Sequence, residues 1–392
     1  MSQINANNIT DSNIDIIPMA FLFQMTTGTG GQPVINFANS GNNCTTFNGT
    51  GLLDCPDIGN DITTCQTKYN KKVLLSVGGA TYTEGGFTSE DKATAAAKQM
   101  WATFGPAQDG SDALRPFGNA SIDGFDLDFE STVTNMVPFA STLRSLMEDA
   151  SGSSSKVPSN STTAPLANST SAATPTSTAV ASNVARQTYR RQSNGTANGT
   201  DSSAATARKF YLTAAPQCPY PDAADNEMLN GTISFDAVFV QFYNNYCGVQ
   251  AFTPTSAATS SSTAAAAATS TSTVKTRISA RQTFTDPNPF NFATWDNWAK
   301  TVSKNPNVQV FVGVPAGQTA AGTGYTPADK LAPVIAYAKT YKSFGGVMMW
   351  DASQAFANTG FLDGVKKDIG AAPTRRRVVR KEGMAMGLKW SA

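Results

Sequence analysis

Three acidic side chains alternate with three large apolar side chains in the segment SIDGFDLDFE, residues 121–130. Asp126, Asp128 and Glu130 take every second position, and a period of two is typical of a β-strand, so these carboxylates should share one face. Like charges this close oppose each other's ionisation, and burial opposes it further. The pattern predicts a carboxylate row at the mouth of a pocket, with Glu130 as proton donor. The alternative is an exposed edge strand with its polar face in water.

The composition narrows the chemistry that such a row can serve. The chain has 392 residues and no histidine, which excludes Ser-His and Cys-His nucleophiles and histidine-ligated metal sites. Its five cysteines are well spread, without a CxxC motif, so we expect no structural zinc cluster. We also expect no other metal and no cofactor. Acid–base chemistry must then fall to carboxylates and tyrosines.

The charge and the hydropathy pattern also exclude partners. The formal net charge of +1 favours neither a nucleic acid nor a membrane surface as a partner. No apolar run approaches the roughly 20 residues that span a bilayer, so we expect no membrane-spanning segment.

Apolar runs typical of buried strands alternate with helical patterns along the chain. Strands are predicted at 14–23, 71–80, 125–130, 209–217, 237–244, 308–316 and 345–351, and helices at 89–104, 135–149, 288–304 and 326–342. This order favours a parallel α/β sheet, and about 280 residues outside the low-complexity segments and the basic tail suit an eight-stranded (β/α) barrel. Only seven strands can be counted, one fewer than such a barrel needs.

Two segments rich in Ser, Thr and Ala, at about 151–207 and 251–283, interrupt this pattern. They cannot bury enough apolar surface to offset their ordering entropy, and we interpret them as disordered insertions. The prediction is therefore one catalytic domain over residues 1–370 and a basic unstructured tail at 371–392.

The compartment signals point in two directions. The chain opens with a polar segment where a secretory signal would be apolar. Cysteines in loop-like contexts and a high density of Asn-x-Ser/Thr acceptors nevertheless favour a secretory origin. The acceptors are Asn8, Asn43, Asn48, Asn119, Asn160, Asn168, Asn194, Asn198 and Asn230.

The acidic segment has a specific resemblance. Asp123-x-x-Asp126-x-Asp128-x-Glu130 resembles the DxxDxDxE signature of glycoside hydrolase family 18, the chitinase family. The blocks SVGG, AAPQCPYPD, VQFYNN and GGVMMWDAS resemble the strand ends of its plant and fungal class III branch. The matches cover essentially all of the chain outside the insertions, the tail and the extreme N-terminus. They imply a (β/α)8 TIM barrel with its site at the carboxyl ends of the strands.

The resemblance also implies a mechanism, retaining hydrolysis of chitin without an enzyme nucleophile. Glu130 would protonate the leaving glycosidic oxygen and later deprotonate water, while the substrate's own acetamido oxygen attacks the anomeric carbon. Asp128 would orient the acetamido N–H, and Asp126 would share a proton with Asp128. Tyr243 would hold the acetamido oxygen.

Further residues at the strand ends are candidates for binding chitin or chito-oligosaccharides. Trp350 would form an apolar floor under the sugar, with plain core packing as the alternative. Gly79 ends the SVGG block that lines the site in the family. The weaker candidates for sugar hydroxyls are amides, for which a solvated strand end or loop is the alternative: Gln217, Gln241, Asn244 and Asn36.

Other functions share parts of this pattern. A non-catalytic lectin or inhibitor on the same fold typically loses the final glutamate, whereas Glu130, Asp128 and Tyr243 all stand here. An endo-β-N-acetylglucosaminidase shares the acidic motif, but the class III strand ends argue against it. We therefore expect a chitinase, monomeric and secreted or associated with the cell wall.

The cysteines add an expectation about the N-terminus. By resemblance, Cys44 pairs with Cys55 and Cys218 with Cys247, which leaves Cys65 without a partner. Its family partner would lie in an N-terminal segment that this chain lacks. By resemblance the strand that this chain lacks is the first of the barrel, and the missing signal peptide has the same explanation.

Overall fold

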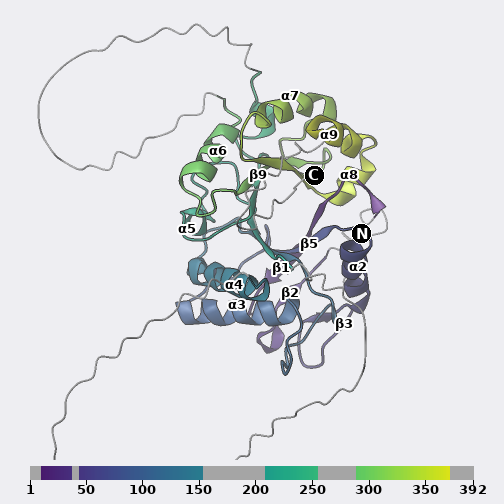
Figure 1. The fold of residues 1–392 in the computed structure, drawn as a ribbon, viewed down its shortest axis with the longest axis vertical. Helices are drawn as coiled ribbons and strands as arrows, with labels where there is room; N and C mark the ends of the chain where they lie inside the picture. Colours follow the sequence, from purple (N-terminus) through teal and green to yellow (C-terminus); the bar gives the residue numbers. More distant parts are fainter. Residues whose placement is uncertain (1–9, 38–43, 153–207, 255–287, 371–392) are drawn as a thin grey trace, which may run out of the picture.

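The computed structural model describes residues 10–37, 44–152, 208–254 and 288–370 (Figure 1). Most of the two predicted insertions and all of the predicted tail lie outside the described residues. Residues 251–254 of the second segment are described, and Phe252 packs there against Phe290 and Tyr337. No described helix is long and apolar enough to cross a membrane.

Seven parallel strands form the centre of the fold. In spatial order they are β1 (Ile16–Gln24), β5 (Lys72–Gly78), β6 (Gly124–Asp128), β7 (Tyr211–Ala214), β8 (Ala237–Gln241), β9 (Gln309–Pro315) and β10 (Phe344–Trp350). Each overlaps a predicted strand. Apolar runs mark most of them as strands buried on both faces, and β6 is marked by its alternation of acidic and large apolar residues. The short β2 (Val34–Ile35) pairs antiparallel with β1, and β3 (Thr45–Thr46) and β4 (Leu53–Asp54) form a separate hairpin.

Helices surround this sheet (Figure 1). They are α2 (Pro56–Thr67), α3 (Glu90–Phe104), α4 (Met136–Ala150), α5 (Asn226–Leu229), α6 (Phe292–Thr301), α7 (Ala328–Ala338), α8 (Ala352–Ala357) and α9 (Phe361–Ile369), with 3-10 turns at Thr29–Gly31 and Val249–Ala251. The α3 and α4 helices lie side by side, and α7 packs on α9. Ser89 caps α3 as expected, since its side chain accepts the N–H of Lys92.

The prediction missed α2, which lies between the predicted strands 14–23 and 71–80, where no helix was expected. Pro56 occupies its first turn, where a missing N–H costs nothing. Its buried side chains Ile58, Ile62 and Cys65 follow helical spacing, so a local signal was present. The α8 and α9 helices were not predicted either.

The sheet is curled into a barrel. A small apolar cluster inside the barrel includes Leu74, Tyr211, Phe239 and Phe311. The larger apolar core includes the buried side chains of the helices. The rings of Phe21 on β1 and Trp350 on β10 stack with centroids 5.6 Å apart, which brings the first and last parallel strands together. In the described part of the chain, β10 and β1 do not pair with each other through backbone hydrogen bonds. The fold is a (β/α) TIM barrel, to which the described residues contribute seven parallel strands.

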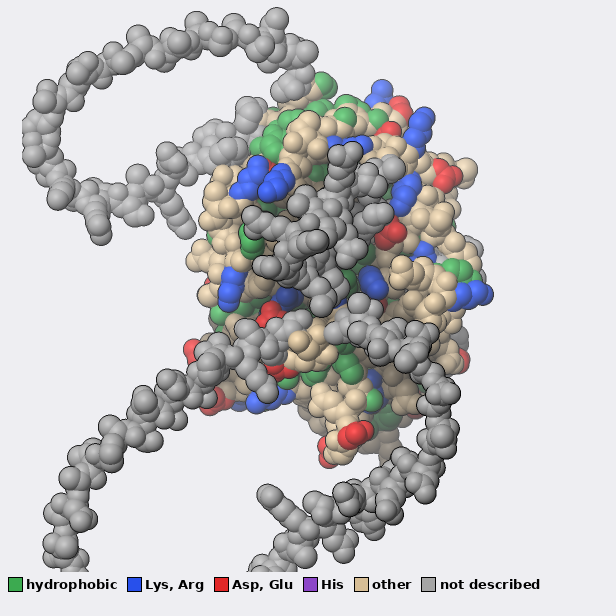
Figure 2. All heavy atoms as spheres, in the orientation of Figure 1, with side chains coloured by type: hydrophobic (Ala, Val, Ile, Leu, Met, Phe, Trp, Pro, Cys, Tyr) green, Lys and Arg blue, Asp and Glu red, His purple; other side chains and the backbone are tan. Residues whose placement is uncertain are grey.

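The cysteines pair as predicted. Cys44 is bonded to Cys55 and Cys218 to Cys247, and Cys65 is a buried free thiol whose pKa burial raises to about 11. On the face shown in Figure 2, acidic and basic side chains are intermixed rather than gathered by sign.

Candidate active site

The acidic strand lies in the middle of the barrel wall. Strand β6 pairs with β5 on one side and β7 on the other, and all five of its residues are buried. A Cβ on Gly124 would lie 1.8 Å from the carbonyl oxygen of Tyr211, so only glycine lets β7 approach this closely. The edge-strand alternative is therefore wrong.

Asp126 is held by hydroxyl groups from both neighbouring strands. Its Oδ1 accepts a hydrogen bond from Thr213 Oγ1 at 2.5 Å, and its Oδ2 accepts one from Ser76 Oγ at 2.9 Å. Burial raises the pKa of Asp126 to about 6, and the two hydrogen bonds oppose this rise. No hydrogen bond joins Asp126 to Asp128 in the described part of the chain, so the proton predicted to be shared between them stays a prediction.

Asp128 is buried and bonded to an amide from β8. Gln241 Nε2 donates to Asp128 Oδ1 and to the carbonyl oxygen of Ala215, both at 2.9 Å. The pKa of Asp128 is raised well above its usual value by burial first and then by Asp126, Glu130 and Asp222, against the Gln241 hydrogen bond. Gln241, predicted as a sugar contact, thus has its amide nitrogen committed to orienting Asp128.

Glu130 lies beyond the end of β6, exposed to solvent. Partial burial still raises the pKa of its carboxyl group. The carboxyl group makes no hydrogen bond to another described residue, so its oxygens stay accessible to a ligand. A raised pKa keeps more of the group protonated, as a general acid requires.

Tyr243 and Trp350 line one cavity with the buried acids. The cavity has a volume of about 160 Å³, and its lining includes Asp126, Asp128, Tyr243, Trp350 and Phe21. Burial raises the pKa of Tyr243, and the charges of Asp128, Glu130 and Asp126 raise it further. Trp350 is half-buried and faces this space, so core packing alone does not describe it.

Sequence reasoning missed several neighbours of these acids. Thr213 and Asp222 were not singled out, and Phe21, which stacks on Trp350, was not expected at the site. The inward alternation along β7, shared by Tyr211, Thr213 and Ala215, was a signal that could have found Thr213.

The weaker candidates are placed differently. The N–H of Gly79 donates to the carbonyl oxygen of Asp128 at 2.6 Å, and a Cβ there would lie 2.8 Å from the ring of Phe21. Asn244 accepts the N–H of Thr323 at 2.9 Å, and Asn36 is exposed while its backbone pairs with Phe21. Neither asparagine lines the cavity.

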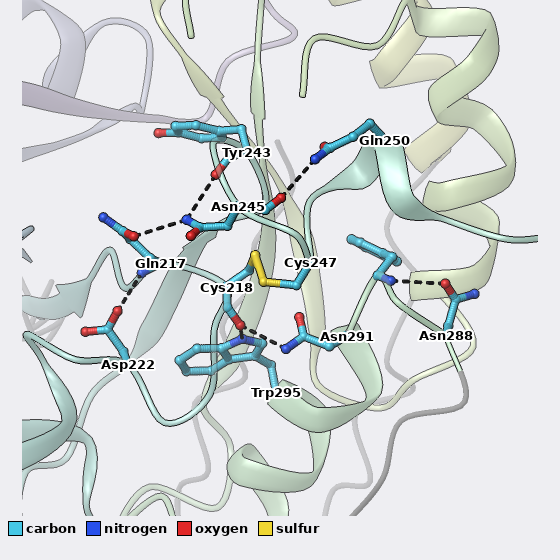
Figure 3. The surroundings of a disulfide bond; sticks show 11 residues. Gln217, Cys218, Asp222, Tyr243, Asn245, Cys247, Gln250, Asn288, Asn291 and Trp295 are labelled. Atoms are coloured by element: carbon cyan, nitrogen blue, oxygen red, sulfur yellow. Dashed lines mark hydrogen bonds between the residues drawn. A yellow bond between two sulfur atoms is a disulfide. The ribbon is translucent and has the colours of Figure 1, made fainter. Parts of the chain in front are cut away.

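Gln217 also lies outside the cavity lining, in the network of Figure 3. Its side-chain oxygen accepts from Asn245 Nδ2 at 3.1 Å, and its N–H donates to Asp222 at 3.1 Å. The Cys218–Cys247 disulfide ties this loop, which follows β7, to the loop after β8 that carries Tyr243.

Asp123, the first acid of the motif, has a structural role at the opposite end of β6. Its Oδ2 accepts the N–H of Val73 at 2.9 Å and the amide of Gln66 at 2.8 Å. Arg208 forms an ion pair with its Oδ1 at 3.1 Å. Among the described residues no cluster of three acidic or thiol side chains could hold a metal ion.

A parallel barrel whose buried carboxylate row ends in an accessible glutamate is the arrangement of a carboxylate-dependent glycosidase. Residues 6–355 match glycosyl hydrolases family 18, and the chain belongs to that family. The class III resemblance is confirmed by a "Class III chitinase" of Arthroderma benhamiae, 43% identical over 365 residues that make up 93% of this chain and 85% of the relative. "Endochitinase 33" of Trichoderma harzianum is 38% identical, covering 90% of this chain and 81% of the relative.

Solved structures share the fold. The ICChI chitinase from Ipomoea carnea superposes with a TM-score of 0.57 at 23% identity, covering 94% of this chain and 95% of that one. The xylanase and α-amylase inhibitor XAIP-II from Scadoxus multiflorus also gives 0.57, at 22% identity and 93% coverage of both chains. Since an enzyme and an inhibitor fit equally well, these likenesses establish the barrel and leave the activity to the site.

Proposed function

We propose that the protein is a chitinase, which hydrolyses β-1,4-linked N-acetylglucosamine polymers with retention of configuration. The observation that carries the proposal is the row Asp126, Asp128 and Glu130, buried at its start and accessible at its end. Relatives named chitinase and endochitinase support the same substrate class.

In the proposed reaction Glu130 gives its proton to the leaving glycosidic oxygen. The substrate's acetamido oxygen forms a bond to the anomeric carbon as the glycosidic bond breaks, giving a cyclic oxazolinium-like intermediate. Glu130, now ionised, takes a proton from water, and that water opens the ring with net retention. One carboxyl group is thereby acid and then base, and no enzyme nucleophile is needed.

The buried groups would orient the acetamido group. Asp128 would accept a hydrogen bond from its N–H, and Tyr243 would donate one to its oxygen. Burial raises the pKa of both aspartates, and that of Asp128 well above its usual value, so the pair carries fewer than two full charges near neutral pH, which favours a stable buried pair. Trp350, supported by Phe21, would lie under the apolar face of the sugar ring.

The first test is Glu130→Gln, assayed on a chitin oligomer beside Glu90→Gln, an exposed glutamate in the first turn of α3. We expect about a 10²–10⁴-fold loss of kcat for Glu130→Gln, with oligomer binding retained, because one positioned acid contributes that much. Glu90→Gln should match the wild type. Wild-type turnover by Glu130→Gln would contradict the assignment.

The substrate itself provides a second test. Chitin oligomers should be cut, whereas cello-oligomers of equal length should not, because they lack the acetamido nucleophile. Equal rates on both would refute substrate assistance. Release of glycans from a high-mannose glycoprotein without chitin cleavage would favour an endo-β-N-acetylglucosaminidase, and oligomer binding without any turnover would favour a lectin.

We also propose that the protein is secreted and monomeric. Two disulfides and three exposed glycosylation acceptors, Asn48, Asn119 and Asn230, support a secretory route. Deglycosylation of the secreted protein followed by gel electrophoresis checks the route, and light scattering checks the mass of the particle.

A further inference from the structure

A single carboxylate joins two loops at the carboxyl end of the barrel. Glu84, in the loop after β5, accepts the N–H of Met25 on Oε2 at 2.6 Å. Its Oε1 accepts the N–H groups of Thr26 and Thr27, both at 3.0 Å. These N–H groups belong to the first three residues after β1, and Glu84 is half-buried against them. Hydrogen bonds from N–H groups to a carboxylate are among the stronger ones in proteins.

The loop that carries Glu84 also braces the segment that carries Glu130. At its start, Gly79 donates to the carbonyl oxygen of Asp128 at 2.6 Å. At its end, Phe87 donates to the carbonyl oxygen of Thr134 at 2.9 Å, and the N–H of Thr134 returns a bond to Gly85 at 3.1 Å. Glu130 therefore lies between two fixed points, both supplied by residues 79–87.

Side-chain packing strengthens the same bracket. The ring of Tyr82 packs edge-on against that of Phe129, next to Glu130, with the ring centroids 5.0 Å apart. The Tyr82 hydroxyl accepts a hydrogen bond from the N–H of Gly86 at 3.1 Å. A Cβ on Gly86 would lie 2.1 Å from the carbonyl oxygen of Thr134, so the backbones touch directly. Movement of residues 79–87 would be passed on to residues 128–134.

We propose that Glu84 is a positioning residue for Glu130. It locks the loop after β1 to the loop after β5, and the loop after β5 in turn fixes residues 128–134, which carry the general acid. Glu84 does not touch the reacting atoms. The inference rests on the proposed function, because it gives a residue outside the motif a role in placing the catalytic proton.

The test compares Glu84→Gln and Glu84→Ala with Glu90→Gln on a chitin oligomer. The amide of Glu84→Gln keeps one acceptor oxygen but sets an NH2 group against a backbone N–H, whereas alanine removes both acceptors. We expect kcat to fall about 10–100-fold for alanine, since a displacement near 1 Å costs that much, and less for glutamine. KM should change less than about threefold, and Glu90→Gln should match the wild type.

Folding is measured separately. Assays run well below the melting temperature of each variant, and amide hydrogen exchange at residues 25–27 should become faster in both Glu84 variants. Folded variants with faster exchange and wild-type kcat would overturn the proposal. A rise in KM with wild-type kcat would also overturn it, because it would mean that the loop after β1 binds substrate. An inactive wild type would instead refute the proposed function.

Discussion

Asp126→Asn should make the protein more stable above neutral pH while lowering its activity. The side chain is 3% exposed, and its pKa lies at about 6 instead of 3.8. Asparagine keeps the shape of the group, and its amide can still bond the hydroxyls of Thr213 and Ser76. The substitution therefore removes a buried titrating group at little cost in packing.

The magnitude follows from the difference in pKa between the folded and unfolded states. Below pH 3.8 the Asp126 carboxyl group is protonated in both the folded and the unfolded state. Its full contribution to the free energy of unfolding of the wild type is then present. Between pH 3.8 and about 6 the unfolded state loses the proton while the folded state keeps it, so wild-type stability falls as pH rises. A shift of about two units corresponds to about 3 kcal/mol, reached above about pH 7.

The assay is urea unfolding of the wild type and Asp126→Asn at several pH values from 4 to 8. The free energy of unfolding of the variant minus that of the wild type should rise with pH and level off above about 7. Changed hydrogen bonds add a constant that does not depend on pH. Removing the Asp126 charge also lowers the pKa of Asp128, which adds in the same direction. A difference that is flat with pH would refute the reasoning.

Two substitutions test the other buried partners. Tyr243→Phe removes only the hydroxyl, and we expect kcat to fall about 10²–10³-fold, as for other single donors to a developing charge, with little change in melting temperature. Unchanged kcat would exclude the proposed contact with the acetamido oxygen. Gln241→Leu removes the donor that favours ionised Asp128, so the acid limb of the kcat/KM profile should move up by about one pH unit or more. Gln217→Leu is the matched control, because its side chain contacts Asn245 instead, and an equal shift in both variants would count against the Gln241–Asp128 bond.

The barrel could be predicted because its strands carry strong local signals. Runs such as residues 308–316 are apolar at nearly every position, which only a strand covered on both faces requires. The α2 helix was hidden by its neighbours, since the glycines, asparagines and cysteines around residues 36–55 indicate a loop. The helix begins at Pro56, directly after Cys55, which occupies the N-cap and is bonded to Cys44.

The acids of the site were predictable for a different reason. Alternation along one strand places Asp126 and Asp128 on the same inward face, whatever the rest of the chain does. Their partners come from strands 50 or more residues away, as Ser76 and Thr213 do for Asp126. Which inward residues meet across a barrel depends on strand register, and the register of parallel strands joined by long crossovers is not encoded in any short segment.

The amides show most clearly where this limit lies. Gln241 and Asn244 stand three residues apart at the end of β8, and both types can bond sugar hydroxyls. In the fold, the positive φ of 59° at Asn244 carries its side chain to the loop at Thr323, while Gln241 stays inward and meets Asp128. Residue type alone makes the two equivalent, and only the backbone turn after the strand separates them. Glu84 shows the same limit. A glutamate in a glycine-rich loop is expected to face solvent, and only the fold brings the backbone N–H groups of residues 25–27 to its carboxylate.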